Sequence, residues 1–184
     1  ARAFAGTLFE YKPDGTGYIL KSYAVAKATE AGTDTTIYLK RDGYSLIPFV
    51  GDNLMVAPES LTGTGTAATV TAVEKATVST EGDAWKVTIS GAIGELTTSS
   101  VLVEAKEAGA SKEAMVTNPN SYLPCDFDFV FDPAASDNDF DAARYLITPA
   151  LALGDVFLYE DRMQPLSDTL KDLNKSKVKG WFNM

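Results

Sequence analysis

Short stretches in which apolar and polar residues alternate, separated by turn-forming residues, run through most of this chain. From Trp85 to Ser90 every second residue is apolar. Because the side chains of a strand point alternately to its two faces, one face of this strand is expected to be apolar and the other polar. Thr69 to Val78 is its expected antiparallel partner, and Glu81-Gly82-Asp83 supplies the turn. The pattern predicts a β-hairpin in the middle of the chain.

Two further turn signals predict hairpins nearer the start of the chain. They are Lys12-Pro13-Asp14-Gly15 and Arg41-Asp42-Gly43, in which proline fixes φ and glycine or aspartate tolerates a positive φ. We expect the second turn to join a strand over 36–40 to a strand over 44–47. Pro48 would end that strand because it has no N–H to donate to a ladder.

The most regular alternation lies between Cys125 and Asp132. Phe127, Phe129 and Phe131 would share one face of a strand there, and Pro133 would end it. Each buried phenylalanine would stabilise the fold by about 1.5 to 3 kcal/mol.

A different periodicity appears near the C-terminus, where we expect a short amphipathic helix. Pro165 suits a first helical turn, and Leu166, Leu170 and Leu173 follow at the spacing of one helical face. Three lysines and then Trp181-Phe182 come after it. These two aromatic residues lie beyond the last periodic position, so they are candidates for an anchor on another subunit; the alternative is a tail folded back on its own domain.

These elements predict a mainly β fold, with antiparallel hairpins forming a sandwich or barrel-like body and a short C-terminal helix. Three regions are expected: an N-terminal β-hairpin region over 1–60, a small Thr/Ala-rich β module over 61–100 that could be an insertion, and a C-terminal β region with the helix and tail over 101–184. At 184 residues, the chain can bury a core without metals or disulfides.

The chain contains no histidine and a single cysteine, Cys125. Serine–histidine and cysteine–histidine nucleophiles are therefore excluded, as is a zinc site of the usual ligands. Gly63-Thr64-Gly65-Thr66-Ala67-Ala68 has the spacing of a dinucleotide-binding loop, but strand-forming residues follow it where a helix is required. We expect no cofactor at this loop. The lone cysteine is expected to be a partly buried structural residue.

The net charge of −9 disfavours nucleic acid and anionic membranes as partners, because both select basic patches. No apolar run approaches the roughly 20 residues needed to span a bilayer, so we expect a soluble protein.

Acidic residues concentrate between 126 and 141, with no lysine or arginine among them. Asp137, Asp139 and Asp141 are therefore candidate ligands for calcium, which prefers oxygen donors. The alternative is a solvated acidic loop. An EF-hand is excluded, because Ala142 and Thr148 stand where that loop requires glycine and glutamate.

Several segments resemble the core of tailed-phage head-fibre and head-decoration proteins. They are Ala24–Ala28, Thr35–Gly43, Gly51–Leu54 with the residues that follow, and the Ala- and Gly-spaced stretch Val101–Gly109. The resemblance implies a protein without catalytic residues that docks on a capsid shell, usually as an oligomer.

The leading hypothesis is therefore a virion structural protein on the capsid exterior that binds a capsid protein and forms homo-oligomers. A second hypothesis is a secreted or cell-surface carbohydrate-binding or adhesive module, which predicts an exposed aromatic platform. A third, an aspartate-dependent hydrolase, would need two carboxylates with opposed pKa shifts in a deep pocket. The first two predict that the chain is not an enzyme.

Overall fold

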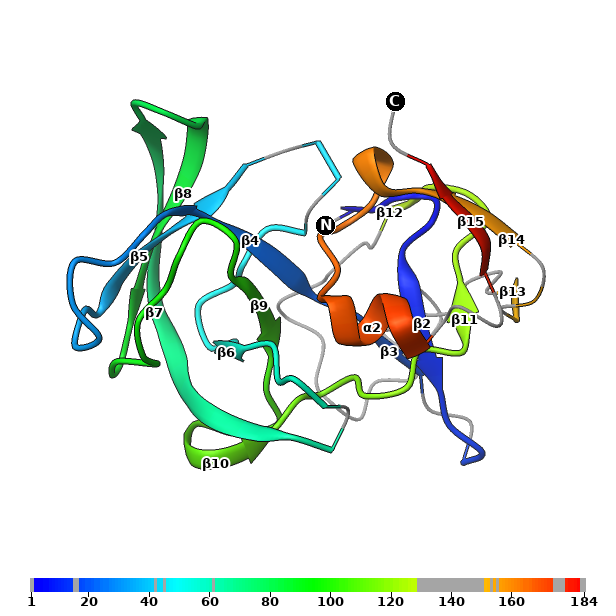
Figure 1. The fold of residues 1–184 in the computed structure, drawn as a ribbon, viewed down its shortest axis with the longest axis horizontal. Coiled ribbons are helices and arrows are strands. Elements are labelled where there is room, and N and C mark those ends of the chain that lie inside the picture. Colours follow the sequence, from blue (N-terminus) through cyan, green and yellow to red (C-terminus); the bar gives the residue numbers. More distant parts are fainter. Residues whose placement is uncertain are drawn as a thin grey trace, which may run out of the picture.

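A computed structural model describes residues 2–14, 17–41, 43–44, 46–60, 62–128, 151–152, 154, 156–173 and 178–182. The fold is mainly β, with mostly antiparallel sheets and a short C-terminal helix, which confirms the expected fold class (Figure 1). A closed barrel forms one side of the molecule. A smaller sheet and the C-terminal elements lie beside it.

Six antiparallel strands close the barrel in the order β7-β6-β9-β4-β5-β8, and β8 pairs back onto β7. The strands are β4 (Ser22–Lys27), β5 (Thr36–Lys40), β6 (Asn53–Val56), β7 (Thr64–Val78), β8 (Gly82–Ile89) and β9 (Val101–Glu104).

Two strands form the corners of this barrel because each changes its pairing partner along its length. The first part of β7 pairs with β6, and its second part pairs with β8. Likewise, β4 pairs with β9 through Ser22 to Ala24 and with β5 from Val25 onward. The register shifts at Val70/Ala72 and Val25/Lys27, close to these changes of partner. A bulge bends and twists a strand, which lets one strand turn a corner.

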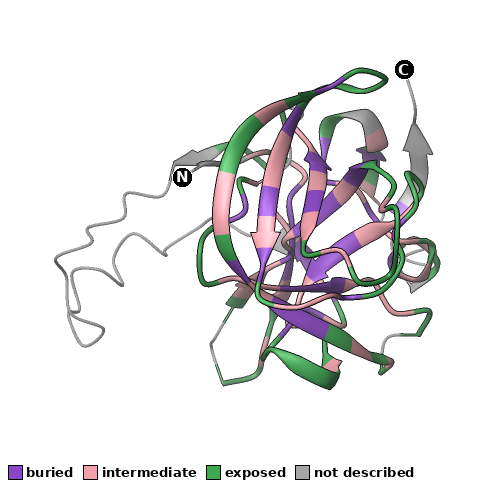
Figure 2. Cartoon of the chain, turned by 90° about the vertical axis from the view of Figure 1, so that its left-hand side faces the viewer, coloured by how far each residue is buried: buried purple, intermediate pink, exposed green. Residues whose placement is uncertain are grey.

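The barrel interior is a single apolar core to which all six strands contribute. Buried and partly buried residues alternate along β5, whereas β6 and β9 each bury two neighbouring residues; Figure 2 colours the chain by burial. The core residues are Tyr23, Val25, Ile37, Leu39, Leu54, Ala68, Val70, Val87, Ile89, Ile93, Leu96 and Leu102. Closing the sheet buries the edges of the six strands as well as one of their faces.

The hairpin predicted in the middle of the chain is confirmed as β7–β8. Val73 pairs with Val87, and Val78 pairs with Gly82 across the turn. Gly82 has φ +79°, a conformation that favours glycine. This hairpin is part of the barrel wall, and the expected boundaries at residues 60 and 100 fall between strands of that one barrel.

The second sheet has the order β13-β11-β2-β3, formed by β2 (Leu8–Tyr11), β3 (Gly17–Ile19), β11 (Ser121–Tyr122) and β13 (Leu151–Ala152). The β2–β3 hairpin confirms the turn predicted at 12–15. β1 (Arg2–Ala3) pairs with β12 (Phe127–Asp128). The strand expected over 125–132 is therefore described only at 127–128, and its remainder, from 129, lies outside the described residues.

The C-terminal elements pack on a second core between the small sheet and the barrel. They are β14 (Val156–Tyr159), the 3-10 turn η1 (Glu160–Arg162), α2 (Asp168–Leu173) and β15 (Val178–Phe182), which pairs in parallel with β14. Leu158, Met163, Leu166, Leu170 and Val178 are buried there against Leu8, Leu20 and Val116. Of the predicted apolar helix face, Leu170 is buried within α2, whereas Leu166 is buried just before the helix begins.

The start of the helix differs from the prediction. α2 begins at Asp168, and Ser167 Oγ accepts a hydrogen bond from Leu170 N at 3.4 Å. Pro165 precedes the helix, and its carbonyl accepts a hydrogen bond from the Ser22 hydroxyl of β4. A serine is a favoured N-cap, so the cap sets the helix start here.

The hairpin expected at Asp42–Gly43 is wrong. β5 pairs with β4 on one side and with β8 on the other, and neither Leu46 nor Ile47 lies in a strand. Both edges of β5 are occupied by these neighbours, which leaves no edge for a strand over 44–47.

One further strand, β10 (Gly109–Glu113), extends the barrel sheet by pairing with the first part of β7. It is irregular: the register shifts between Gly109 and Lys112, and Ser111 has φ +54°. Ion pairs flank it, from Lys106 to Glu113 at 2.6 Å and from Lys112 to Glu107 at 2.7 Å.

Candidate binding surfaces

A loop between β5 and β6 presents three large apolar side chains to solvent. Ile47 is 48% exposed, Phe49 47% and Val50 66%. Two neighbouring residues anchor the loop on the protein. Leu46 packs against Phe9 and Leu123 of the small-sheet core, and Pro48 is buried. We call Ile47, Phe49 and Val50 the apolar tip.

Asp52 fixes the end of this loop on the barrel. Its Oδ2 accepts a hydrogen bond from Phe49 N at 3.1 Å, and its own N–H donates to Phe49 O at 3.1 Å. Val70 N donates to Asp52 O at 2.8 Å, and Gly51 N donates to Val70 O at 2.9 Å. The backbone below the apolar tip is therefore tied to β7, which limits the entropy that the tip would lose on binding.

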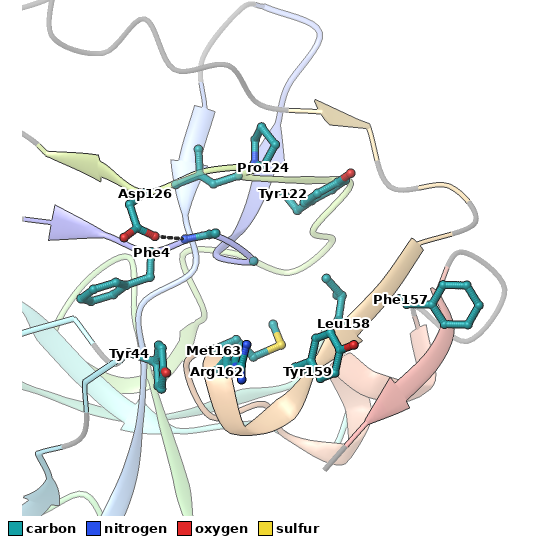
Figure 3. Close-up of a pocket in the computed structure, with 13 residues that line it drawn as sticks. Phe4, Tyr44, Tyr122, Pro124, Asp126, Phe157, Leu158, Tyr159, Arg162 and Met163 are labelled. Carbon is teal, nitrogen blue, oxygen red and sulfur yellow. Dashed lines mark hydrogen bonds between the residues drawn. The ribbon is translucent and has the colours of Figure 1, made fainter. Parts of the chain in front are cut away.

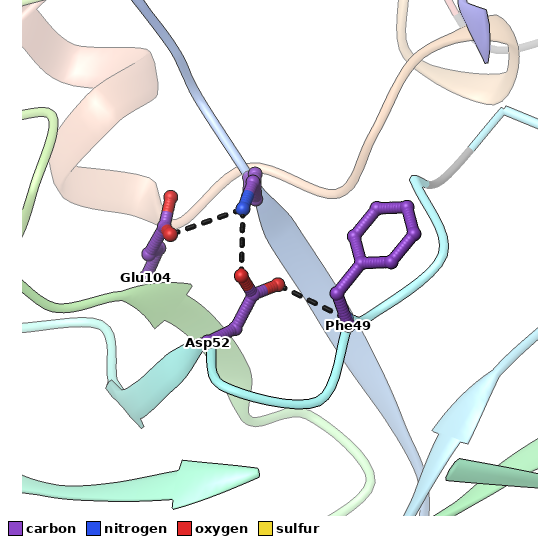
Figure 4. A network of polar contacts seen from close by, with 4 residues as sticks. Phe49, Asp52 and Glu104 are labelled. Atoms are coloured by element: carbon purple, nitrogen blue, oxygen red, sulfur yellow. Dashed lines mark hydrogen bonds and ion pairs between the residues drawn. The ribbon is translucent and has the colours of Figure 1, made fainter. Parts of the chain in front are cut away.

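The same aspartate belongs to a three-residue ionic cluster (Figure 4). Lys21 Nζ lies 2.8 Å from Asp52 Oδ1 and 3.0 Å from Glu104 Oε1. The three side chains are 23%, 11% and 16% exposed, respectively. The ammonium thus lies between two carboxylates at one end of the barrel, where water screens them less than at an open surface.

Burial and neighbouring charges shift the pKa values of Lys21 and Glu104 in this cluster. Burial alone would lower the pKa of Lys21, but the hydrogen bond to Asp52 and the charge of Glu104 outweigh it and raise that pKa. Burial raises the pKa of Glu104 against the opposing effect of Lys21. Asp52 and Glu104 share Lys21 as their cation, so Lys21 stabilises the negative charges of both carboxylates in the folded state.

Tyr23 places a hydroxyl in the barrel core close to this cluster. The residue is fully buried, and its hydroxyl oxygen has no hydrogen-bond partner among the described residues. Burial, together with the charges of Asp52 and Glu104, raises its pKa well above the ordinary value. Burial and the two negative charges therefore both favour the neutral form of this phenol.

An open hollow of about 620 Å³ lies between the small sheet and the C-terminal elements (Figure 3). One wall is formed by Tyr122, at the end of β11, and by Pro124 and Asp126, which follow that strand. Tyr44, Tyr159, Arg162 and Met163 form the facing wall. Phe4 lies at one end with its ring edge-on to that of Tyr44, their centroids 5.8 Å apart.

The charged side chains of the hollow are held in place. Asp126 Oδ1 accepts a hydrogen bond from Ala5 N at 2.9 Å. The guanidinium carbon of Arg162 lies 5.6 Å from the ring centroid of Tyr159, within the range of a cation–π contact. Phe157 and Tyr159 remain 57% and 45% exposed on β14. The hollow therefore combines accessible aromatic rings with one carboxylate and one guanidinium.

The residues expected from the sequence to form sites are only partly placed by the structure. Asp137, Asp139 and Asp141, the candidate calcium ligands, lie outside the described residues. Trp181 and Phe182 lie in β15, where they are the register partners of Leu158 and Tyr159. The backbone of this tail is thus paired within its own chain, and the role of its two aromatic residues in binding a partner stays a prediction.

Cys125 is exposed, not partly buried as expected, because it lies in the turn after β11. Within the described ranges, no three His, Cys, Asp or Glu side chains come together as metal ligands. No helix in the part of the chain that the structure describes has the length and apolar character to cross a bilayer.

Comparison with known proteins gives no relative: no family model, curated protein or solved structure matches the chain.

Sequence patterns did not indicate the apolar tip, the ionic cluster or the hollow. The tip falls in the segment that the turn signal assigned to a strand. The cluster and the hollow each bring together residues from separate parts of the chain, and nothing in their local sequence marks them. Only the run Leu46-Ile47-Pro48-Phe49-Val50, apolar but interrupted by proline, was a usable signal for an exposed loop.

Proposed function

We propose that this protein is a non-enzymatic structural component of a phage virion, of the head-fibre or capsid-decoration type. It binds a capsid protein on the outside of the shell and associates with copies of itself. The observation that carries this proposal is the apolar tip of Ile47, Phe49 and Val50, exposed on a loop that is tied to a closed barrel.

The physical reasoning concerns what such a tip gains on binding. Burying apolar surface contributes about 25 cal/mol for each Å² removed from water. A tethered loop loses little conformational freedom when a partner covers it, so more of that free energy remains as affinity. The resemblance of Thr35–Gly43 and Gly51–Leu54 to head-decoration proteins favours a capsid protein as the partner, because these segments flank the tip on both sides.

The absence of histidine from the sequence supports a role without catalysis, since the commonest general base is missing. In the ionic cluster, both carboxylates pair with Lys21. That arrangement suits a structural role for these three charges.

The first test is the gene neighbourhood, where we expect genes for a portal, a protease and a major capsid protein. The purified chain is then mixed with shells assembled from the neighbouring capsid gene, and co-sedimentation is measured. We expect the double variant Phe49→Ser/Val50→Ser to bind at least about 10-fold more weakly than the parent. Tyr11→Ser, which removes a similarly exposed aromatic side chain from β2, is the matched control.

If the loop variant binds the shells as tightly as the parent does, the apolar tip is not the capsid-binding surface. Failure of the parent chain to sediment with the shells would remove the capsid role. Self-association is tested separately by light scattering over a range of concentrations, and a strict monomer throughout would contradict it.

A further inference from the structure

We propose that the hollow between β11 and the C-terminal elements is a binding site for a neutral saccharide. This site is separate from the apolar tip and adds glycan recognition to the proposed structural role. The inference rests on three features of the lining: its aromatic rings, its balanced charge and its size.

The aromatic rings suit the shape of a sugar. A pyranose ring has an apolar face of C–H groups and a rim of hydroxyls, so it is recognised by a flat aromatic surface with hydrogen-bonding groups around it. Tyr122 lies on one wall of the hollow, and Tyr44 and Tyr159 lie on the other (Figure 3). A tyrosine offers both parts of this recognition, because its ring is apolar and its hydroxyl donates and accepts hydrogen bonds.

The charges favour a neutral ligand. Among the described residues that line the hollow, Asp126 is the one carboxylate and Arg162 the one guanidinium, so the two charges balance. The chain as a whole has a net charge of −9. A phosphorylated lipid, a sulfated glycan or a nucleic acid would meet repulsion from the chain without a surplus of cations in the hollow to offset it. A neutral sugar avoids this cost, and its hydroxyls can pair with both charged groups.

The size fits a short stretch of glycan. Small-molecule sites usually enclose about 300 to 1,000 Å³, and the hollow, at about 620 Å³, lies within that range. Its mouth is open, and two of its lining residues, Phe157 and Tyr159 on β14, remain 57% and 45% exposed. A chain of sugar units can therefore occupy the hollow and continue across these two rings. An apolar peptide is the competing ligand, and a panel of peptides distinguishes it from a glycan.

The test begins with the purified chain on an array of neutral and acidic glycans, with a panel of random peptides on the same support. Dissociation constants for the best neutral glycan are then measured by titration calorimetry. We expect Tyr159→Ala to weaken binding at least about 10-fold, since a truncated aromatic anchor commonly costs that much. Tyr159→Phe, which keeps the ring, is expected to stay within about 3-fold of the parent. Tyr11→Ala removes a comparably exposed tyrosine outside the hollow and should leave binding unchanged.

Three results would overturn this inference: no binding to any neutral glycan, binding that Tyr159→Ala leaves intact, or binding to acidic glycans alone. Capture of peptides that is lost in Tyr159→Ala, without glycan binding, would make the hollow a peptide site. Thermal unfolding of each variant shows that the fold is retained, which is expected because Tyr159 is nearly half exposed. Capsid binding uses other residues, so the two proposals can fail independently.

Discussion

Removing the ammonium of Lys21 tests how far the ionic cluster stabilises the fold. Lys21→Met keeps most of the side-chain volume but leaves Asp52 and Glu104 with no cation between them. Exposed ion pairs contribute at most about 1 kcal/mol, whereas removing one partner of a buried pair costs about 3 to 5 kcal/mol. With all three side chains less than a quarter exposed, we expect a loss of about 2 to 3 kcal/mol of unfolding free energy at pH 7.

Urea denaturation followed by circular dichroism measures this loss. For an m-value of about 2 kcal/mol/M, the midpoint should fall by about 1 to 1.5 M. Lys86→Met is the matched control, because its ion pair with Glu74 has a similar length, 3.0 Å, but is open to solvent on the β7–β8 hairpin. The control should unfold at nearly the same urea concentration as the parent.

The loss of unfolding free energy in Lys21→Met should also depend on pH, and Glu104 determines whether the loss grows or shrinks as the pH falls. Burial already raises the pKa of this carboxyl in the folded state, and loss of Lys21 raises it further. As the pH falls toward the ordinary value of 4.5, the folded variant takes up a proton before the unfolded chain does. The variant therefore regains stability relative to the parent between pH 7 and about 4.5. A deficit that stays constant over this range, or one no larger than that of Lys86→Met, would refute the reasoning.

Three other substitutions test the barrel, its hairpin and the tail. Leu102→Ala, at a fully buried core position, should cost about 2 to 5 kcal/mol in urea denaturation, and a loss below about 1 kcal/mol would contradict a closed, filled barrel. Gly82→Ala, at φ +79°, should destabilise by about 1 kcal/mol, whereas Gly91→Ala, where an added Cβ meets open space, should not; equal effects would contradict the turn conformation. If Trp181 anchors another subunit, Trp181→Ala should shift light scattering toward monomer without lowering the unfolding midpoint, and a lower midpoint with unchanged mass would favour a tail that serves its own domain.

The alternation of residue types was sufficient to predict the parts of the fold that depend on neighbours in sequence. The β7–β8 hairpin and the β2–β3 hairpin both follow from a turn signal between two strand-like runs. Closure of the barrel could not be predicted in this way. It requires Tyr23 to pair with Leu102 and Ile37 with Val87, and contacts this distant leave no periodic mark in the sequence. The preceding strand β4 takes one edge of β5 and the distant strand β8 takes the other, which is why the local signal at Asp42–Gly43 failed.

The candidate sites also depend on contacts between residues that are distant in the sequence. Lys21, Asp52 and Glu104 each look like ordinary surface charges in the sequence, and only the pairing of β9 with β4 and β6 brings them together. Tyr44 and Tyr122, which are far apart in the sequence, likewise line the same hollow only in the folded chain. A single sequence can thus reveal which chemistry is missing, as with histidine, more readily than which side chains converge.

The irregular end strand β10 bears on the proposed assembly of this protein in many copies. Sheets with a flat, unpaired border tend to recruit further strands and grow into fibrils. Here the bulge at Gly109–Lys112 and the charged side chains of Lys112 and Glu113 make that border a poor template. In the proposed assembly, neighbouring copies would therefore contact one another through loops and side chains, because this border of the barrel sheet is a poor edge for strand addition.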